Sequence, residues 1–262
     1  MTSKGTAAIT GASSGIGAAF ARRLAAQGYD LLLVARRAER LADLKQSLTS
    51  EYGVAVETWT GDLADAADLA RLERRLEDEP VAMLVNNAGA GGLGPTGVAG
   101  ADAQEALIRL NVIALVRLSV AALAGFRKTG TGSLVNIASV IAFAPSAGGA
   151  SYSGSKAFVL NFTRSLQLEY ADSGFRIQAI LPGPIRTEFF TSQGLSDSIF
   201  PDSAYISAEE LVDAGLAGLA VGETVTVPTL ASDSVWNDME TARQSFLGEV
   251  LGGKVASRYK AG

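Results

Sequence analysis

A tyrosine and a lysine lie four residues apart, at Tyr152 and Lys156, in a stretch whose pattern predicts a helix. Residues at this spacing share one face of a helix, so we expect the phenol and the ammonium to be neighbours. A free tyrosine has a pKa of about 10, and a nearby cation lowers that pKa because it stabilises the phenolate. The pair is therefore predicted to exchange protons near neutral pH as a general acid or base.

The pair stands out because the 262-residue chain contains no histidine and no cysteine. These absences exclude an imidazole base, a thiolate nucleophile, a disulfide and any metal site that depends on histidine or cysteine. Sites built from carboxylates and water are weaker candidates, and we expect no metal. The formal net charge of −5 disfavours a nucleic-acid platform, which would usually be basic.

A glycine-rich segment of sequence TGASSGIG spans residues 10–17, between a predicted strand at 6–10 and a predicted helix at 18–27. Glycines at such a turn let the backbone approach a pyrophosphate closely. The helix that follows supplies unpaired N–H groups and a favourable dipole for an anion. The segment can also be a plain strand–helix turn, but its position favours a nucleotide site.

The elements that must position these residues alternate along the whole chain. Short apolar runs predict strands at 6–10, 31–34, 54–59, 82–85, 133–138, 176–181 and 224–227. Segments with helical spacing lie between and after them, at 18–27, 38–52, 65–77, 103–126, 152–173, from 208 onward and at 238–250. This alternation predicts an α/β fold: one Rossmann-like, doubly wound domain over 1–262, with about seven parallel strands and helices on both faces.

Five segments together resemble the motifs of the short-chain dehydrogenase/reductase family, in order and at the expected spacing over residues 5–190. They are the glycine segment at 10–17, the NNAG sequence at 86–89, Ser139, the pair formed by Tyr152 and Lys156, and the PGPIRT sequence at 182–187. The resemblance implies an enzyme that transfers a hydride between a nicotinamide cofactor and a carbonyl or alcohol.

The resemblance also implies roles for the catalytic residues. Tyr152 would donate the proton, Ser139 would orient the substrate, and Lys156 would lower the tyrosine pKa and hold the nicotinamide ribose. Asn111, inside an apolar helix, would interrupt that helix and hold a water that links Lys156 to solvent. The alternatives are a loop or capping serine at 139 and a satisfied buried amide at 111.

The end of the second strand indicates which nicotinamide cofactor is preferred. Enzymes that use NAD place an acid there, whereas this chain has Arg36 and Arg37, which suit a 2′-phosphate. We expect NADP(H) to be preferred and NAD(H) to be possible, with Arg36 as first choice, Ser13 assisting and Arg37 second. The alternative is a pair of solvated surface arginines. By the resemblance, the cofactor contacts are Gly11, Ser13, Ser14, Gly15, Ile16, Gly17, Arg36, Arg37, Asp62, Leu63, Asn87, Ala88, Gly89, Tyr152, Lys156, Pro182, Gly183, Ile185 and Thr187.

Two stretches are expected to contact the substrate. In the family the irregular stretch at about 186–207 is a lid, and here it carries Phe189, Phe190, Ile199, Phe200 and Tyr205. Ile141 and Phe143 are expected to add to the pocket wall. These side chains suggest an apolar, uncharged carbonyl compound, although packing in the core is an equally good interpretation. Asp62 can likewise be a helix cap rather than a contact to adenine.

The predicted function is NADPH-dependent reduction of a small, apolar ketone or aldehyde, in a reversible reaction. The alternatives are an NAD(P)-dependent secondary-alcohol dehydrogenase and a non-catalytic, nucleotide-binding regulatory protein on the same fold. We expect a cytoplasmic homodimer or homotetramer that binds neither nucleic acid nor membrane, paired through 103–126 and 152–173. The apolar window at 107–126 is interrupted by polar residues, which favours a buried helix over a membrane span. Unlike many relatives, the chain ends in a helix-like tail.

Overall fold

The computed structural model describes residues 3–189, 191, 194, 196 and 199–260. These residues form two compact units, Met1–Pro228 and Thr229–Gly262. The first unit holds the sheet and every predicted site residue. For the second unit, the expectation of one domain over 1–262 stays a prediction.

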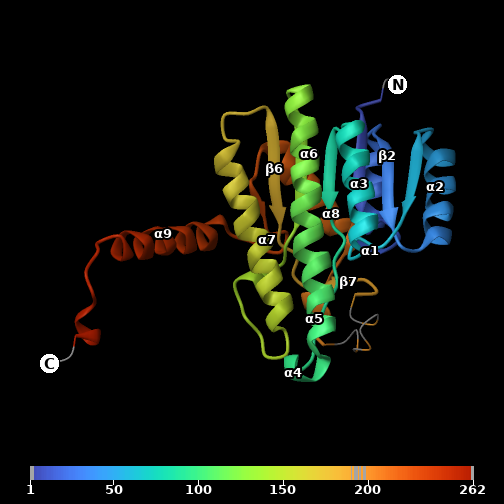
Figure 1. The fold of residues 1–262 in the computed structure, drawn as a ribbon. Coiled ribbons are helices and arrows are strands. Elements are labelled where there is room, and N and C mark those ends of the chain that lie inside the picture. The colour runs from blue at the N-terminus through green and yellow to red at the C-terminus, as the bar shows by residue number, and fades with distance from the viewer. Residues whose placement is uncertain (1–2, 190, 192–193, 195, 197–198, 261–262) are drawn as a thin grey trace. The chain divides into compact units, whose positions relative to one another are not determined.

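A seven-stranded parallel sheet forms the centre of the first unit (Figure 1), in the order β3-β2-β1-β4-β5-β6-β9. The predicted doubly wound α/β sheet is therefore confirmed. The central strands are apolar on both faces because helices cover both, as in β2, where five of six residues are buried. The strands are β1 Thr6–Thr10, β2 Asp30–Ala35, β3 Val56–Thr60, β4 Met83–Asn86, β5 Gly132–Ile137, β6 Phe175–Ile180 and β9 Val225–Thr226.

Helices pack on the two faces of this sheet. One layer contains α1, α2 and α8, and the other contains α3, α6 and α7. The helices of this unit are α1 Gly15–Ala26, α2 Ala38–Tyr52, α3 Ala66–Asp78, α4 Thr96–Ala99, α5 Ala101–Ile108, α6 Leu115–Thr129, α7 Ala150–Glu169 and α8 Ala208–Val221. The short pairing of β7 (Ile185–Arg186) with β8 (Ile206–Ser207) joins the two ends of the expected lid.

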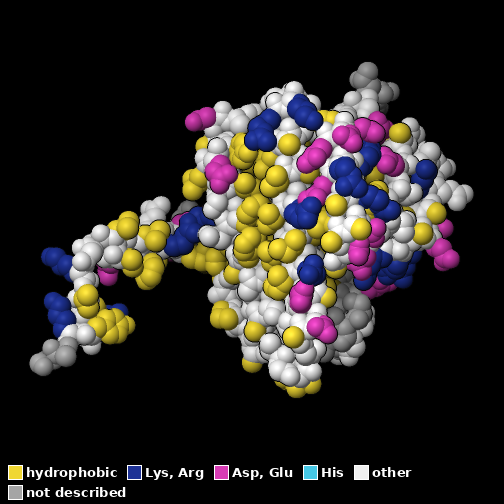
Figure 2. All heavy atoms as spheres, in the orientation of Figure 1, with side chains coloured by type: hydrophobic (Ala, Val, Ile, Leu, Met, Phe, Trp, Pro, Cys, Tyr) yellow, Lys and Arg dark blue, Asp and Glu magenta, His cyan; other side chains and the backbone are white. Residues whose placement is uncertain are grey.

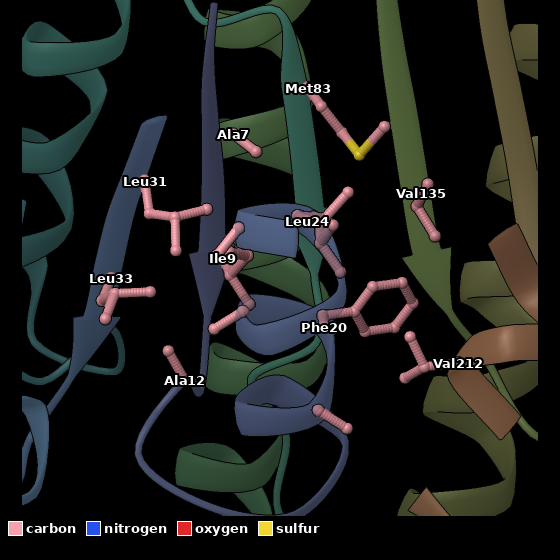
Figure 3. Packing of buried hydrophobic residues seen from close by; sticks show 14 of the residues in the cluster. Ala7, Ile9, Ala12, Phe20, Leu24, Leu31, Leu33, Met83, Val135 and Val212 are labelled. Atoms are coloured by element: carbon pink, nitrogen blue, oxygen red, sulfur yellow. The ribbon is translucent and has the colours of Figure 1, made fainter. Parts of the chain in front are cut away.

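The core between α1 and the sheet holds the glycine segment in place. Figure 3 shows Phe20 and Leu24 of α1 among Ile9, Val135 and Val212, and all five side chains are buried. Burying a side chain of this size contributes roughly 1.5–3 kcal/mol. Because α1 is anchored in this way, its first turn is held directly after the end of β1.

The helix predicted at 103–126 is interrupted. A wide π turn, Arg109–Ala114, joins α5 to α6, and Asn111 lies in it. The run 101–129 is the one helix among the described residues that is long and apolar enough to cross a membrane by length and composition. Half of its most apolar window is buried, and α6 packs against α3, β4 and β5.

The second unit consists largely of α9, Asp233–Val250, which begins earlier than the predicted 238. The hydroxyl of Ser232 caps its first turn by accepting from the amide of Ser234. No residue of α9 is buried, and its apolar side chains include Phe246, Leu247 and Val250.

Candidate active site

One cleft of about 790 Å³ runs along the carboxyl ends of the parallel strands, where ligands bind in open α/β sheets. Nearly all the predicted site residues line it, which brings together segments from the whole length of the first unit. Gly17 and Asn111 are the predicted site residues that do not line the cleft. The lining residues from the prediction are Gly11, Ser13, Ser14, Gly15, Ile16, Arg36, Arg37, Asp62, Leu63, Asn87, Ala88, Gly89, Ser139, Tyr152, Lys156, Pro182, Gly183, Ile185 and Thr187.

The glycine segment forms a tight cradle at the N-terminus of α1. Gly11 has a φ of 69°, which favours glycine. A Cβ on Gly17 would lie 2.3 Å from the Gly11 carbonyl oxygen, so Gly17 supports the turn from behind. The side chain of Ser14 makes no capping hydrogen bond, which leaves the first amides of α1 available to an anion.

Asn87 ties this cradle to the end of β4. Its Nδ2 donates to the Thr10 carbonyl oxygen at 2.9 Å. The Thr10 hydroxyl accepts from the backbone amides of Asn87 and Ala88 at 3.0 and 2.9 Å. The two strand ends are thus held together by three hydrogen bonds, which stiffens the floor of the cleft.

Tyr152, Ser139 and Lys156 meet in the middle of the cleft. The Tyr152 hydroxyl hydrogen-bonds the Ser139 side chain, whose Oγ lies 3.2 Å from the Pro182 carbonyl oxygen. Lys156 is buried and donates from Nζ to the Ile137 carbonyl oxygen at 2.9 Å. Its Nζ lies 5.9 Å from the centroid of the Tyr152 ring. The three side chains predicted for proton transfer are therefore neighbours.

The predicted lowering of the tyrosine pKa is wrong for this structure. Burial raises the pKa of Tyr152 to about 12, because desolvation disfavours the phenolate, and the hydrogen bond with Ser139 opposes this rise only in part. Burial also lowers the pKa of Lys156 to about 8. At neutral pH, Tyr152 therefore keeps its proton and Lys156 is mainly charged. This is the protonation state that a proton donor requires.

Asn111 lies behind the cleft and holds the loop after β4. Its Oδ1 accepts from the Ala90 amide at 2.8 Å, and its Nδ2 donates to the Ala90 carbonyl oxygen at 2.9 Å and to the Ser155 hydroxyl at 3.1 Å. The interpretation as a satisfied buried amide fits these contacts, and the expected interruption of the helix is the π turn. The proposed water between Asn111 and Lys156 stays a prediction.

The two arginines after β2 differ in a way that the sequence did not indicate. Arg37 contacts the glycine segment, with its Nε and one terminal nitrogen 3.1 and 3.0 Å from Ser13 Oγ. Arg36, the expected first choice, has a side chain that is 73% exposed and lies 3.8 Å from Asp62. Asp62 is not the cap of α3, because Asp65 has that role. The structure thus places Arg37, rather than Arg36, against the predicted phosphate cradle.

The other end of the cleft is apolar. Ile141, Phe189, Ile199 and Phe200 line it as expected, and the Phe189 ring lies 5.6 Å from that of Tyr152, centroid to centroid. Tyr205 packs on Phe200 outside the lining, and Phe143 is largely exposed and does not line the cleft. Phe190 lies outside the described residues. The lining residues that the sequence analysis missed at this end are Leu93, Ala144 and Ser146, which come from loops without periodic pattern.

Comparisons with known proteins agree with this architecture. The family model described as short chain dehydrogenase matches residues 5–197. Sulfoacetaldehyde reductase 2 of Chromohalobacter salexigens is 35% identical over 215 residues, which is 78% of this chain and 84% of that protein.

Two solved structures are similar over nearly the whole chain. A short-chain dehydrogenase from Sphingobium yanoikuyae in complex with NADPH is 43% identical, with a TM-score of 0.92 over 97% of this chain and 99% of that one. A bulky-bulky ketone specific alcohol dehydrogenase from Comamonas testosteroni is 39% identical, with a TM-score of 0.90 over 99% and 100%. The chain belongs to the short-chain dehydrogenase family of oxidoreductases.

Proposed function

We propose that this protein is an NADPH-dependent reductase of apolar, uncharged ketones or aldehydes, in a reversible reaction. The observation that carries the proposal is the position of a protonated Tyr152, hydrogen-bonded to Ser139, between a phosphate cradle and an apolar end of one cleft. The relative solved in complex with NADPH supports the cofactor, and the relative specific for bulky ketones supports the substrate class.

The residues present fit an NADP(H) molecule. The cradle at Gly11 and the first turn of α1 suit the pyrophosphate, and the cations after β2 suit a 2′-phosphate. The wall from Asn87 to Gly89 and Lys156 suit the nicotinamide half. When bound, the cofactor would supply the hydride, which is the redox chemistry that side chains lack.

The chain's own residues would then handle the oxygen of the substrate. Ser139 and Tyr152 would hold the carbonyl oxygen by hydrogen bonds, and Tyr152 would deliver its proton to that oxygen. The charged Lys156 would stabilise the phenolate that forms, and the apolar side chains of the lid would exclude water. In the reverse direction Tyr152 must first lose its proton, so oxidation of an alcohol is expected to need a higher pH than reduction.

The charges lining the cleft favour an uncharged substrate. The cations among its described lining residues are Arg36, Arg37 and Lys156. The two arginines belong to the phosphate corner, and Lys156 is buried with its ammonium on the Ile137 carbonyl. Along the described part of the apolar end, therefore, no cation faces a sulfonate or carboxylate. A substrate as anionic as sulfoacetaldehyde would meet the side chains of Leu93, Ile141 and Phe189 instead.

We propose a cytoplasmic homodimer or homotetramer as the working assembly. The face of α6 and α7 carries exposed apolar side chains, and Figure 2 shows this apolar band on the surface. Its members are Ile113 in the π turn, Val120 on α6, and Phe158 and Leu168 on α7. A patch of this kind supports pairing through these helices, and the mass in solution would test it.

The deciding experiment follows loss of NADPH absorbance with a panel of aryl ketones, aliphatic ketones and aldehydes, and with sulfoacetaldehyde as the anionic control. We expect turnover with apolar ketones, a lower kcat/KM with NADH, and little turnover of the anion. A preference for sulfoacetaldehyde would contradict the substrate class. Binding of NADPH without turnover of any carbonyl would favour a regulatory protein, and efficient oxidation with poor reduction would favour an alcohol dehydrogenase.

A further inference from the structure

The lid carries a carboxylate that lies directly on the predicted phosphate corner. Glu188 follows β7 and lines the cleft. It accepts from a terminal nitrogen of Arg37 at 3.0 Å and, through both carboxylate oxygens, from a terminal nitrogen of Arg40 at 2.9 Å. The sequence separates Glu188 from Arg37 by 151 residues, so this contact is a product of the fold.

Arg37 is thus shared between two partners. The nitrogens that do not face Glu188 bind Ser13 at 3.1 and 3.0 Å and Ser14 at 2.6 Å. The neighbouring arginines keep the pKa of Glu188 below its usual value, so the carboxylate is ionised at neutral pH. An anion already neutralises the guanidinium that the 2′-phosphate of NADP(H) would need.

We propose that Glu188 is a specificity-determining residue that competes with the 2′-phosphate for Arg37. This inference rests on the proposed preference for NADP(H). The sequence has no acid at the end of β2, where enzymes that use NAD usually place one. Glu188 supplies a negative charge to this corner from the lid instead. With NAD(H) bound, Glu188 stays on Arg37, which is then not left unpaired; with NADP(H) bound, the phosphate displaces it.

The charges of the corner set the direction of the effect. Arg36, Arg37 and Arg40 supply three positive charges, and Glu188 and Asp62 supply two negative ones. Removing the charge of Glu188 therefore makes the corner more positive and strengthens its attraction for a phosphate dianion. Because Glu188 is about half exposed, with 51% of its side chain accessible, the effect is modest and sensitive to salt.

The test measures binding of fragments by calorimetry, so it does not depend on turnover. Adenosine 2′,5′-bisphosphate carries the 2′-phosphate, and adenosine 5′-monophosphate lacks it. We expect Glu188→Gln to bind the bisphosphate about fivefold more tightly, which corresponds to roughly 1 kcal/mol, and to bind the monophosphate as the parent does. The gain should shrink as the ionic strength is raised.

Asp213→Asn is the matched control. It removes one carboxylate from another exposed ion pair, with Arg23, that does not line the cleft. It changes the net charge by the same amount and should alter neither affinity. If it tightened the bisphosphate as much as Glu188→Gln does, the effect would be one of net charge and the proposal would fail.

Three further outcomes would overturn the role of Glu188: unchanged affinity for the bisphosphate in Glu188→Gln, weaker affinity, or equal tightening of both fragments. Weaker affinity would mean that Glu188 orients Arg37 for the phosphate. The parent protein tests the cofactor preference separately. If it binds the bisphosphate no better than the monophosphate, the 2′-phosphate site itself is wrong, and the competition falls with it.

Discussion

The two ends of the proposed cofactor site are built on different physical principles. At the phosphate corner the side chains are charged and partly exposed, and each arginine has more than one possible partner. At the catalytic end Lys156 is buried, and burial shifts the pKa of both Lys156 and Tyr152. Exposed charges make specificity adjustable at little cost, whereas buried groups give strong chemistry at a cost in stability. Substitutions at the two ends should therefore differ in size and in sensitivity to salt.

The largest effect is expected at the catalytic end. Tyr152→Phe removes the proton donor but keeps the ring, which packs beside Phe189. We expect kcat for reduction to fall about a thousandfold, with the melting temperature nearly unchanged. Steady-state rates with NADPH and the best ketone of the panel would measure this. Turnover near the parent rate would show that another group donates the proton.

The cost of the buried ammonium should appear as stability gained on its removal. Burial lowers the pKa of Lys156 from 10.5 to about 8, so its charge destabilises the fold at neutral pH. Lys156→Met should abolish activity yet raise the free energy of unfolding by about 2 kcal/mol at pH 7, after allowing for the lost hydrogen bond to the Ile137 carbonyl.

The sign of this effect can be checked by pH. Between about pH 8 and 10.5 the unfolded chain holds the Lys156 proton and the folded chain does not. The parent protein should therefore gain stability in this range relative to Lys156→Met, and the difference between them should narrow. Urea unfolding at pH 7 and pH 9.5 would measure it. A variant less stable than the parent at pH 7 would contradict a costly burial.

At the phosphate corner we expect a smaller and more selective loss. Arg37→Ala should raise the KM for NADPH about tenfold and leave that for NADH nearly unchanged, because its guanidinium lies on Ser13 and Ser14. Arg36→Ala is the comparison, and its effect should be weaker because its side chain is largely exposed. The reverse order would restore Arg36 as the main phosphate ligand.

The pH dependence of reduction should be the mildest effect. Raising the pH above about 8 removes the proton of Lys156, while Tyr152 stays protonated until about pH 12. We expect kcat/KM for the ketone to fall with rising pH, to about a tenth of its plateau one pH unit above the lysine pKa. No histidine is present to confuse the assignment. A flat profile from pH 7 to 10 would contradict a role for the charged lysine.

Much of the fold could be predicted because its signals are local. The strand at 6–10 matches β1 residue for residue, and the helix at 38–52 matches α2. The short helix α4 was missed because it lies among glycines, and the π turn was missed because apolar spacing continues across it.

The site residues could be found from motif and order, but their physical states could not. The direction of the Tyr152 pKa depends on burial by loops that lie far away in the sequence. The choice between Arg36 and Arg37 depends on the extended backbone of Arg37, the residue before α2. The contact with Glu188 joins segments 151 residues apart, and no local pattern predicts it.

The π turn at Arg109–Ala114 makes the long helix two helices out of register with each other. Each hydrogen bond in such a turn closes one residue later than in an α-helix, so the turn accommodates one extra residue. Deleting that residue would convert 101–129 into a regular helix and rotate one part relative to the other. The damage would appear first where Asn111 grips Ala90, at the edge of the cleft. A single-residue deletion here would act as a lesion of the active site, although it lies in a helix that contributes no side chain to proton transfer.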